Sequence, residues 1–159
     1  MASSNHNDGT GLGNYELRFT NAGQALGEAR RRNRQHNWPI VVEGLRDKRA
    51  LESLNFVGPI EVLNRGWNLE RVVAYLYETY GTRNNSAGGS SVCLLMDWDR
   101  TGGRLQRKLA RLLEGFDMLV DQDTRVVLQK NLKPETRVLE SLHGMADRLR
   151  YFVNQEDPL

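Results

Sequence analysis

The chain has 159 residues, of which 39% are hydrophobic and 26% charged, and its formal net charge is +2. This length suits one globular domain with its own core and is too short for two comfortable ones. The single cysteine, Cys93, excludes an internal disulfide and favours a reducing compartment, and no apolar run approaches the length of a membrane span. We therefore expect a cytoplasmic protein without a signal peptide or a membrane partner.

The first 37 residues divide into a polar tail and a basic helix. Residues 1–13 are rich in Ser, Asn and Gly, which is typical of disorder, and we expect a flexible tail over residues 1–20. A weak apolar stripe predicts a helix from Asn21 to Gln35, within a basic segment at 21–37. Its end is either a solvated helix terminus or an arm that contacts phosphates, since it carries a dense cluster formed by Arg30, Arg31, Arg32 and Arg34.

Two short apolar runs, Ile40–Val42 and Ile60–Leu63, predict the first two strands of a sheet. The first run ends at Glu43-Gly44 and turns directly into a helix that contains Asp47 and Lys48. The second run is followed by a turn and by Asn68, which we expect to cap a helix with one apolar face. A flexible surface loop is expected at residues 82–91.

The most informative stretch is Val92–Arg104. Its first five residues have no polar face, as expected of a central strand buried on both sides. The run ends in Asp97-Trp98-Asp99, and the alternation of strand side chains places both aspartates on the same side. Two carboxylates at a strand end suit a hard cation such as Mg²⁺. Gly102 and Gly103 then allow a tight turn into the next helix.

The helix expected from Gly103 to Glu114 has a leucine face and a basic face. The basic face either binds an anionic partner or is simply solvated, and it carries Arg104, Arg107, Lys108 and Arg111 at helical spacing. Farther along, the patterns predict a fourth strand at 118–120, a helix rather than a strand at 123–132, a short edge strand at 136–139 and a helix at 144–154.

Strands that alternate with helices at this spacing indicate an α/β fold of three layers: a central, mostly parallel sheet of about four strands flanked by helices. In a parallel sheet all strand carboxyl ends lie on one edge. Glu43 is therefore expected to converge with Asp97 and Asp99, although 54 residues separate Glu43 from Asp97.

Residues 41–47 (VVEGLRD) and 96–103 (MDWDRTGG) resemble the two signature motifs of the Toprim domain. Bacterial primases, topoisomerases, OLD-family nucleases, recombination-mediator proteins and a bacterial ribosomal-RNA maturase share that domain. The small, stand-alone archaeal primase-like Toprim proteins are the nearest in appearance. The resemblance implies a Toprim-like, Rossmann-like domain at residues 38–142, followed by a C-terminal helix and tail at 143–159.

The resemblance also implies roles for individual residues. Glu43 would be a metal ligand or a general acid/base, and Asp97 and Asp99 would hold Mg²⁺, with Mn²⁺ as a substitute. Asp47 would support the site or bind a second metal ion, and Arg100 would reach a scissile phosphate. The competing interpretation is that both aspartates merely cap the following helix.

These roles imply Mg²⁺-dependent phosphodiester chemistry on RNA or DNA, by a small nuclease. A primase-like nucleotidyl transferase is less favoured, because so short a chain has no obvious second domain for template and primer. A non-enzymatic module that binds nucleic acid or a ribonucleoprotein is the alternative. The basic residues expected to contact nucleic acid are Arg30, Arg31, Arg32, Arg34, Lys48, Arg104, Arg107, Lys108 and Arg111.

Overall fold

A computed structural model describes the backbone of residues 2–159 and the side chains of residues 14–159. Four parallel strands form one sheet in the order β2-β1-β3-β4. The expected α/β architecture with a four-stranded parallel sheet is therefore confirmed. The strands comprise β1 (Ile40–Val42), β2 (Ile60–Val62), β3 (Val92–Leu94) and β4 (Val120–Asp121). β1 has the expected bounds, β2 and β3 end before their apolar runs do, and β4 begins at Val120 rather than at residue 118.

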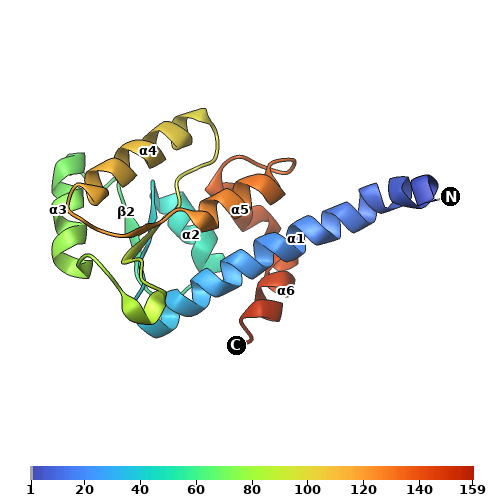
Figure 1. Cartoon of the computed structure of the whole chain (residues 1–159), viewed down its shortest axis with the longest axis horizontal. Coiled ribbons are helices and arrows are strands. Elements are labelled where there is room, and N and C mark those ends of the chain that lie inside the picture. Colours follow the sequence, from blue (N-terminus) through green and yellow to red (C-terminus); the bar gives the residue numbers. More distant parts are fainter. Residues whose placement is uncertain (1) are drawn as a thin grey trace.

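Helices cover both faces of the sheet and enclose two apolar cores (Figure 1). One face packs against α3 (Leu69–Tyr80) and α4 (Arg100–Glu114). The other face packs against α1 (Ala2–His36), α2 (Leu45–Ser53), α5 (Asp123–Leu132), the 3₁₀ helix η2 (Leu139–Met145) and α6 (Ala146–Glu156). Among the described residues, no helix is both long enough and apolar enough to cross a membrane.

The alternation of side chains along the central strands explains why two cores form. Val41 and Leu94 point into the core under α3 and α4, whereas Val42 and Cys93 point into the core under α1 and α2. Successive strand residues face opposite sides, so a strand without a polar face must be covered twice.

Helix α1 begins at Ala2 rather than at Asn21, so the expected tail at residues 1–20 is wrong for residues 2–20, and Met1 lies outside the described residues. Over residues 15–20 the reason is tertiary contact, which the weak apolar stripe did not reveal. Phe19 is buried against Tyr15 and Phe152, and Arg18 forms an ion pair with Glu135.

One member of the arginine cluster at the end of α1, Arg30, is part of the protein core, which corrects its expected role as a phosphate contact. Arg30 is 0% exposed and donates hydrogen bonds to Asp157, at 2.7 Å, and to the carbonyl of Leu54, at 3.0 Å. Arg30 therefore cannot contact a phosphate. The other arginines of the cluster form ion pairs: Arg31 with Glu156, Arg32 with Glu28 and Arg34 with Asp157.

Other element boundaries differ from the sequence expectation in smaller ways. The edge strand expected at 136–139 does not form; the carbonyls of Thr136 and Arg137 instead accept hydrogen bonds from the side chain and backbone of Trp98. The expected loop at 82–91 contains a short 3₁₀ helix, η1 (Asn85–Ala87), whose Ala87 is buried. Helix α4 begins three residues earlier than expected, at Arg100, and α6 begins at Ala146.

Candidate functional site

The candidate site lies where the chain leaves the sheet in opposite directions from two neighbouring strands. β1 connects through α2 to β2 on one side, and β3 connects through α4 to β4 on the other. Pairing continues past the strand ends, because the Leu95 N–H donates to the Val41 carbonyl at 2.9 Å. In open α/β sheets, ligands bind at such a switch point, outside the carboxyl ends of the strands. Glu43 and Asp97 follow these two strands.

On the β1 side, a hydrogen bond fixes the turn that carries Glu43. Asp47, at the start of α2, accepts a hydrogen bond from the Gly44 N–H at 2.9 Å. This bond folds the helix start back onto the strand end, so the buried Asp47 supports the turn. Glu43 itself is half-buried, and its carboxylate accepts no hydrogen bond from the described residues.

On the β3 side, each aspartate uses one oxygen to hold backbone. Asp99 caps α4, because its Oδ1 accepts from the Gly102 N–H at 2.7 Å. Asp97 Oδ1 accepts from the Leu139 N–H, also at 2.7 Å, and so holds the start of η2. No hydrogen bond from the described residues reaches Oδ2 of either aspartate. Asp99 therefore does cap the helix, as the competing interpretation holds. One oxygen of each aspartate nevertheless remains available to a ligand.

Gly102 lets α4 begin directly against the sheet. A Cβ at this position would lie 2.0 Å from the carbonyl oxygen of Asp97, which is backbone and has no room to move. Gly44, by contrast, has no crowded neighbour: its Cβ would come no closer than 3.9 Å to Asp47. The motif at residues 96–103 thus contains a glycine, Gly102, that close packing requires.

The carboxylates at this edge repel one another. Burial raises the pKa of Asp97 to about 6, and the nearby charges of Asp47 and Asp99 add to the rise while the Leu139 N–H opposes it. Burial also raises the pKa of Glu43, with further contributions from Asp97 and Asp99. The pKa of Asp47 is raised by burial as well. The charges of Asp97 and Asp99 therefore reach Glu43 at this edge of the sheet, and the site favours a positive partner.

Arg125, on α5, is a site residue that the sequence motifs missed. Its Nε donates to the Met96 carbonyl at 3.1 Å, and its Nη2 donates to the Asp97 carbonyl at 2.7 Å. Burial and the neighbouring Arg107 lower its pKa. A Cβ on Gly103 would lie 3.5 Å from Arg107 Nη1 and 3.6 Å from Arg125 Nη2, so both guanidinium groups lie at the first turn of α4. The only feature of the sequence that could have identified Arg125 is its position, since it follows the fourth strand at the same sheet edge.

The remaining basic residues of the prediction are distributed along two helices. Lys48 is half-buried on α2, whereas the residues of α4 are exposed: Arg100, Arg104, Arg107, Lys108 and Arg111. Within the part of the chain that the structure describes, none of these six forms an ion pair. Arg100, Arg104 and Arg107 lie in the first two turns of α4, beside the carboxylates, and Arg111 lies one turn farther away.

The carboxylates do not form a closed metal cage. Among the described residues, no group of three or more His, Cys, Asp or Glu side chains is arranged to hold a metal ion.

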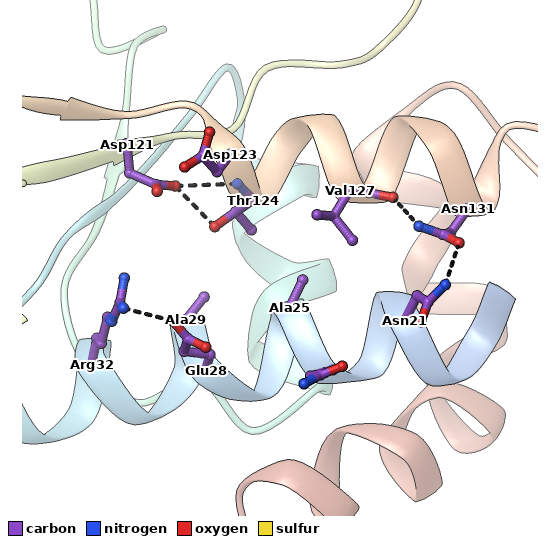
Figure 2. A pocket seen from close by; sticks show the side chains of 11 residues that line it. Asn21, Ala25, Glu28, Ala29, Arg32, Asp121, Asp123, Thr124, Val127 and Asn131 are labelled. Atoms are coloured by element: carbon purple, nitrogen blue, oxygen red, sulfur yellow. Dashed lines mark hydrogen bonds and ion pairs between the residues drawn. The ribbon is translucent and has the colours of Figure 1, made fainter. Parts of the chain in front are cut away.

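A separate pocket of about 450 Å³ lies between α1 and α5 (Figure 2). None of the three converging carboxylates lines it. Its polar walls are largely bonded to each other: Asn21 donates to Asn131 at 3.1 Å, and Asp121 accepts from the Thr124 hydroxyl at 2.9 Å. The pocket is distinct from the sheet edge and offers few free polar groups.

Fold and site together define an α/β protein with a four-stranded parallel sheet and an acidic cluster at its carboxyl edge. No protein-family model matches the chain. It is 36% identical to the UPF0292 protein of Thermococcus onnurineus over 112 residues, which are 70% of this chain and 76% of the relative. It is 33% identical to the UPF0292 protein of Thermococcus sibiricus, over 74% of this chain and 84% of the relative. The chain belongs to the UPF0292 family.

A solved structure supports the same architecture. A protein from Aquifex aeolicus superposes with a TM-score of 0.58 and 27% sequence identity, over 74% of this chain and 94% of that chain. Its name states no activity.

Proposed function

We propose that the chain carries out Mg²⁺-dependent phosphodiester chemistry on nucleic acid, as a small nuclease with a Toprim-type site. One observation carries the proposal. Glu43, Asp97 and Asp99 converge at the switch point of the sheet, where burial and mutual repulsion raise the pKa of Glu43 and Asp97. A site that gathers carboxylates against their own repulsion is typical of cation binding.

The donor atoms fit Mg²⁺. Carboxylate oxygens are the hard ligands that this ion prefers, and Oδ2 of both aspartates and both oxygens of Glu43 remain available. Bound there, Mg²⁺ would neutralise charge on a phosphodiester and lower the pKa of a bound water.

The chain's own side chains would then bind the phosphate and move a proton. Arg107 and Arg125 offer guanidinium groups at the first turn of α4, which suit the oxygens of a phosphate. The N-terminus of α4 adds a favourable dipole for an anion. Glu43, a half-buried carboxylate at the same strand end, would accept or donate a proton as a general acid/base.

The resemblance to Toprim proteins supports the proposal but does not carry it. The run Glu-Gly-x-x-Asp follows β1 and the run Asp-x-Asp-Arg-x-Gly follows β3, on adjacent parallel strands. A nucleotidyl transferase of the primase-like kind would use the same carboxylates.

A non-enzymatic module that binds nucleic acid is the second candidate, because Asp97 and Asp99 each hold backbone with one oxygen. One experiment separates the two functions. The purified protein is incubated with pooled RNA and DNA in Mg²⁺, in Mn²⁺ and in EDTA. We expect metal-dependent cleavage that falls at least about 100-fold in Glu43→Gln.

Glu114→Gln is the matched control, because Glu114 is exposed at the opposite end of α4. It should cleave like the wild type, and thermal melts should show that both variants are folded. Binding of nucleic acid without cleavage in either metal would reject the nuclease and favour the binding module.

A further inference from the structure

The turn between β2 and α3 lies directly beside the candidate carboxylates. The Asn64 N–H donates to the carbonyl of Glu43 at 3.0 Å, and the Leu63 N–H donates to the carbonyl of Val42 at 2.9 Å. Asn68 then caps α3 by accepting from the Arg71 N–H at 2.9 Å. Residues 64–68 therefore border the site on the side away from α4.

This turn and the start of α3 carry an aromatic and cationic cluster that the proposed chemistry does not use. The guanidinium carbon of Arg71 lies 4.1 Å from the ring centroid of Trp67, and that of Arg65 lies 5.2 Å from it. Tyr75 packs edge-on against Trp67, with ring centroids 5.7 Å apart. Trp67 is partly exposed and Arg71 is exposed, so the outer side of the cluster faces solvent.

The inner side of the cluster is rigid and electrically balanced. Arg65 donates to the Val62 carbonyl at 2.7 Å and forms an ion pair with Glu61 at 2.8 Å. Glu61 also accepts from the hydroxyls of Tyr75 and Tyr80. Burial alone would raise the pKa of Glu61, but these hydrogen bonds bring it below its ordinary value, so the carboxylate stays charged opposite Arg65.

Arg71 differs from Arg65 because it has no counter-ion. Within the described residues Arg71 forms no ion pair. Its planar guanidinium lies over the indole ring of Trp67, which its neighbours hold in place. A free cation stacked on an aromatic ring suits a flat, electron-rich group next to a phosphate. Unpaired nucleobases have this chemistry, and they stack on aromatic rings and on arginine planes regardless of sequence.

We propose that Trp67 and Arg71 bind an unpaired base of a single-stranded nucleic acid whose backbone continues to Glu43, Asp97 and Asp99. This inference rests on the proposed function and specifies its substrate as single-stranded. In a duplex each base is stacked between its neighbours, and exposing one costs energy. The cluster therefore selects strands whose bases are already free.

Tryptophan fluorescence in EDTA tests the inference without cleavage. Trp38 and Trp98 are 0% and 3% exposed, so a strand that stacks on the surface quenches Trp67. Three probes of one sequence are titrated: single-stranded RNA, single-stranded DNA and the DNA duplex. We expect either single strand to quench and the duplex to leave the fluorescence unchanged.

Variants test the residues, with affinity measured by the anisotropy of a labelled single strand. Trp67→Leu should weaken binding roughly tenfold. Arg71→Lys keeps the charge but loses the plane and should weaken binding as well. Tyr77→Leu is the control, because Tyr77 is 39% exposed at the other end of α3. It should bind like the wild type. Equal affinity of wild type and Trp67→Leu, or equal quenching by duplex and single strand, would overturn the inference.

Cleavage assays on the same variants separate this failure from failure of the proposed function. If Trp67→Leu binds and cleaves like the wild type, base stacking is rejected while the nuclease stands. If binding depends on Trp67 but no metal supports cleavage, the nuclease is rejected while the base-binding surface stands.

Discussion

Gly102 lies where the first turn of α4 passes against the carbonyl of Asp97, and an added Cβ would meet that oxygen at 2.0 Å. We expect Gly102→Ala to lower the free energy of unfolding by about 2 kcal/mol, because backbone on both sides must shift. Since Asp97 must move, metal-dependent activity should fall as well. Chemical denaturation and the cleavage assay measure the two effects.

The adjacent Gly103 is the control for this prediction. Its Cβ would meet only the flexible ends of Arg107 and Arg125, at 3.5 and 3.6 Å. Alanine is the better helix former, so Gly103→Ala should leave stability unchanged or raise it by up to about 1 kcal/mol. Equal losses in both variants would contradict the steric role of Gly102.

Asp97 is the residue at which structural and catalytic roles compete. In EDTA at pH 7.5 we expect Asp97→Asn to melt at the wild-type temperature or up to about 4 °C above it. The amide removes a carboxylate that the site repels, and its oxygen can still accept from the Leu139 N–H. Metal-dependent activity should be lost. A clearly lower melting temperature would show that Asp97 is chiefly structural.

The difference in melting temperature between the wild type and Asp97→Asn should depend on pH, because the pKa of Asp97 is raised. A carboxyl group whose pKa rises on folding, here to about 6, lowers stability as pH rises through that value. Any advantage of Asp97→Asn should therefore be present at pH 7.5 and disappear near pH 4. Melts of both proteins across this range measure it.

At the scale of elements, the contact between α1 and the segment after α6 depends on one carboxylate. Asp157 accepts from Arg30, which is fully buried, and from Arg34. Removing one partner of a buried pair leaves the other charge unpaired, so Asp157→Asn should cost about 3 kcal/mol in urea denaturation. Asp147→Asn, which breaks an exposed pair with Arg150, should cost less than about 1 kcal/mol.

The same carboxylate predicts acid sensitivity. Hydrogen bonds from Arg34, and then from Arg30, lower the pKa of Asp157 despite its burial. A carboxyl group whose pKa falls on folding stabilises the protein above its unfolded value, about 3.9, and this contribution is lost as pH falls through the folded pKa. Below about pH 4 the wild type should therefore lose its advantage over Asp157→Asn in thermal melts. A constant difference down to pH 2 would contradict this linkage.

Elements were predictable from sequence where local pattern and burial agree. β1 and β3 are marked by apolar runs with no polar face, and Asn68 caps α3 as expected. The part of α1 just before Asn21 was not predictable, because Phe19 packs against Phe152, more than 130 residues away in sequence. The failed edge strand at 136–139 has a similar cause, since Trp98 captures its carbonyls.

The candidate site, like the helices and strands, was predictable only in part. Parallel topology alone brings Glu43 to Asp97 and Asp99, so their convergence follows from the order of strands and helices. Arg125 was missed because its helix is ambiguous in sequence and no motif marks it. The burial of Arg30 could not be predicted from the sequence, because its counter-ion, Asp157, lies 127 residues later in the chain.

At the scale of the whole molecule, the exposed cations of α4 differ from the arginine cluster at the end of α1, whose members form ion pairs. Arg107 and Arg111 are exposed, and neither forms an ion pair among the described residues. Changing both to Gln should lower nucleic-acid affinity and flatten its dependence on salt by about one unit of slope per lost contact. Binding isotherms at several salt concentrations measure the slope.

Arg31 and Arg32 provide a control with the same change in net charge. Both form ion pairs on α1, with Glu156 and Glu28. The double change to Gln should leave the slope unaltered. If both double variants flatten the slope equally, overall charge attracts the nucleic acid and α4 has no special part.

The pairing of Arg30 with Asp157 also has a consequence for the order in which a newly made chain folds. At roughly 5 to 20 residues per second, a ribosome needs about 6 to 25 s to add the 127 residues that separate them. During that interval the guanidinium of Arg30 has no Asp157 to neutralise it, and burying an unpaired charge is costly. We therefore expect α1 to pack onto the sheet late, after the segment that carries Asp157 has been made.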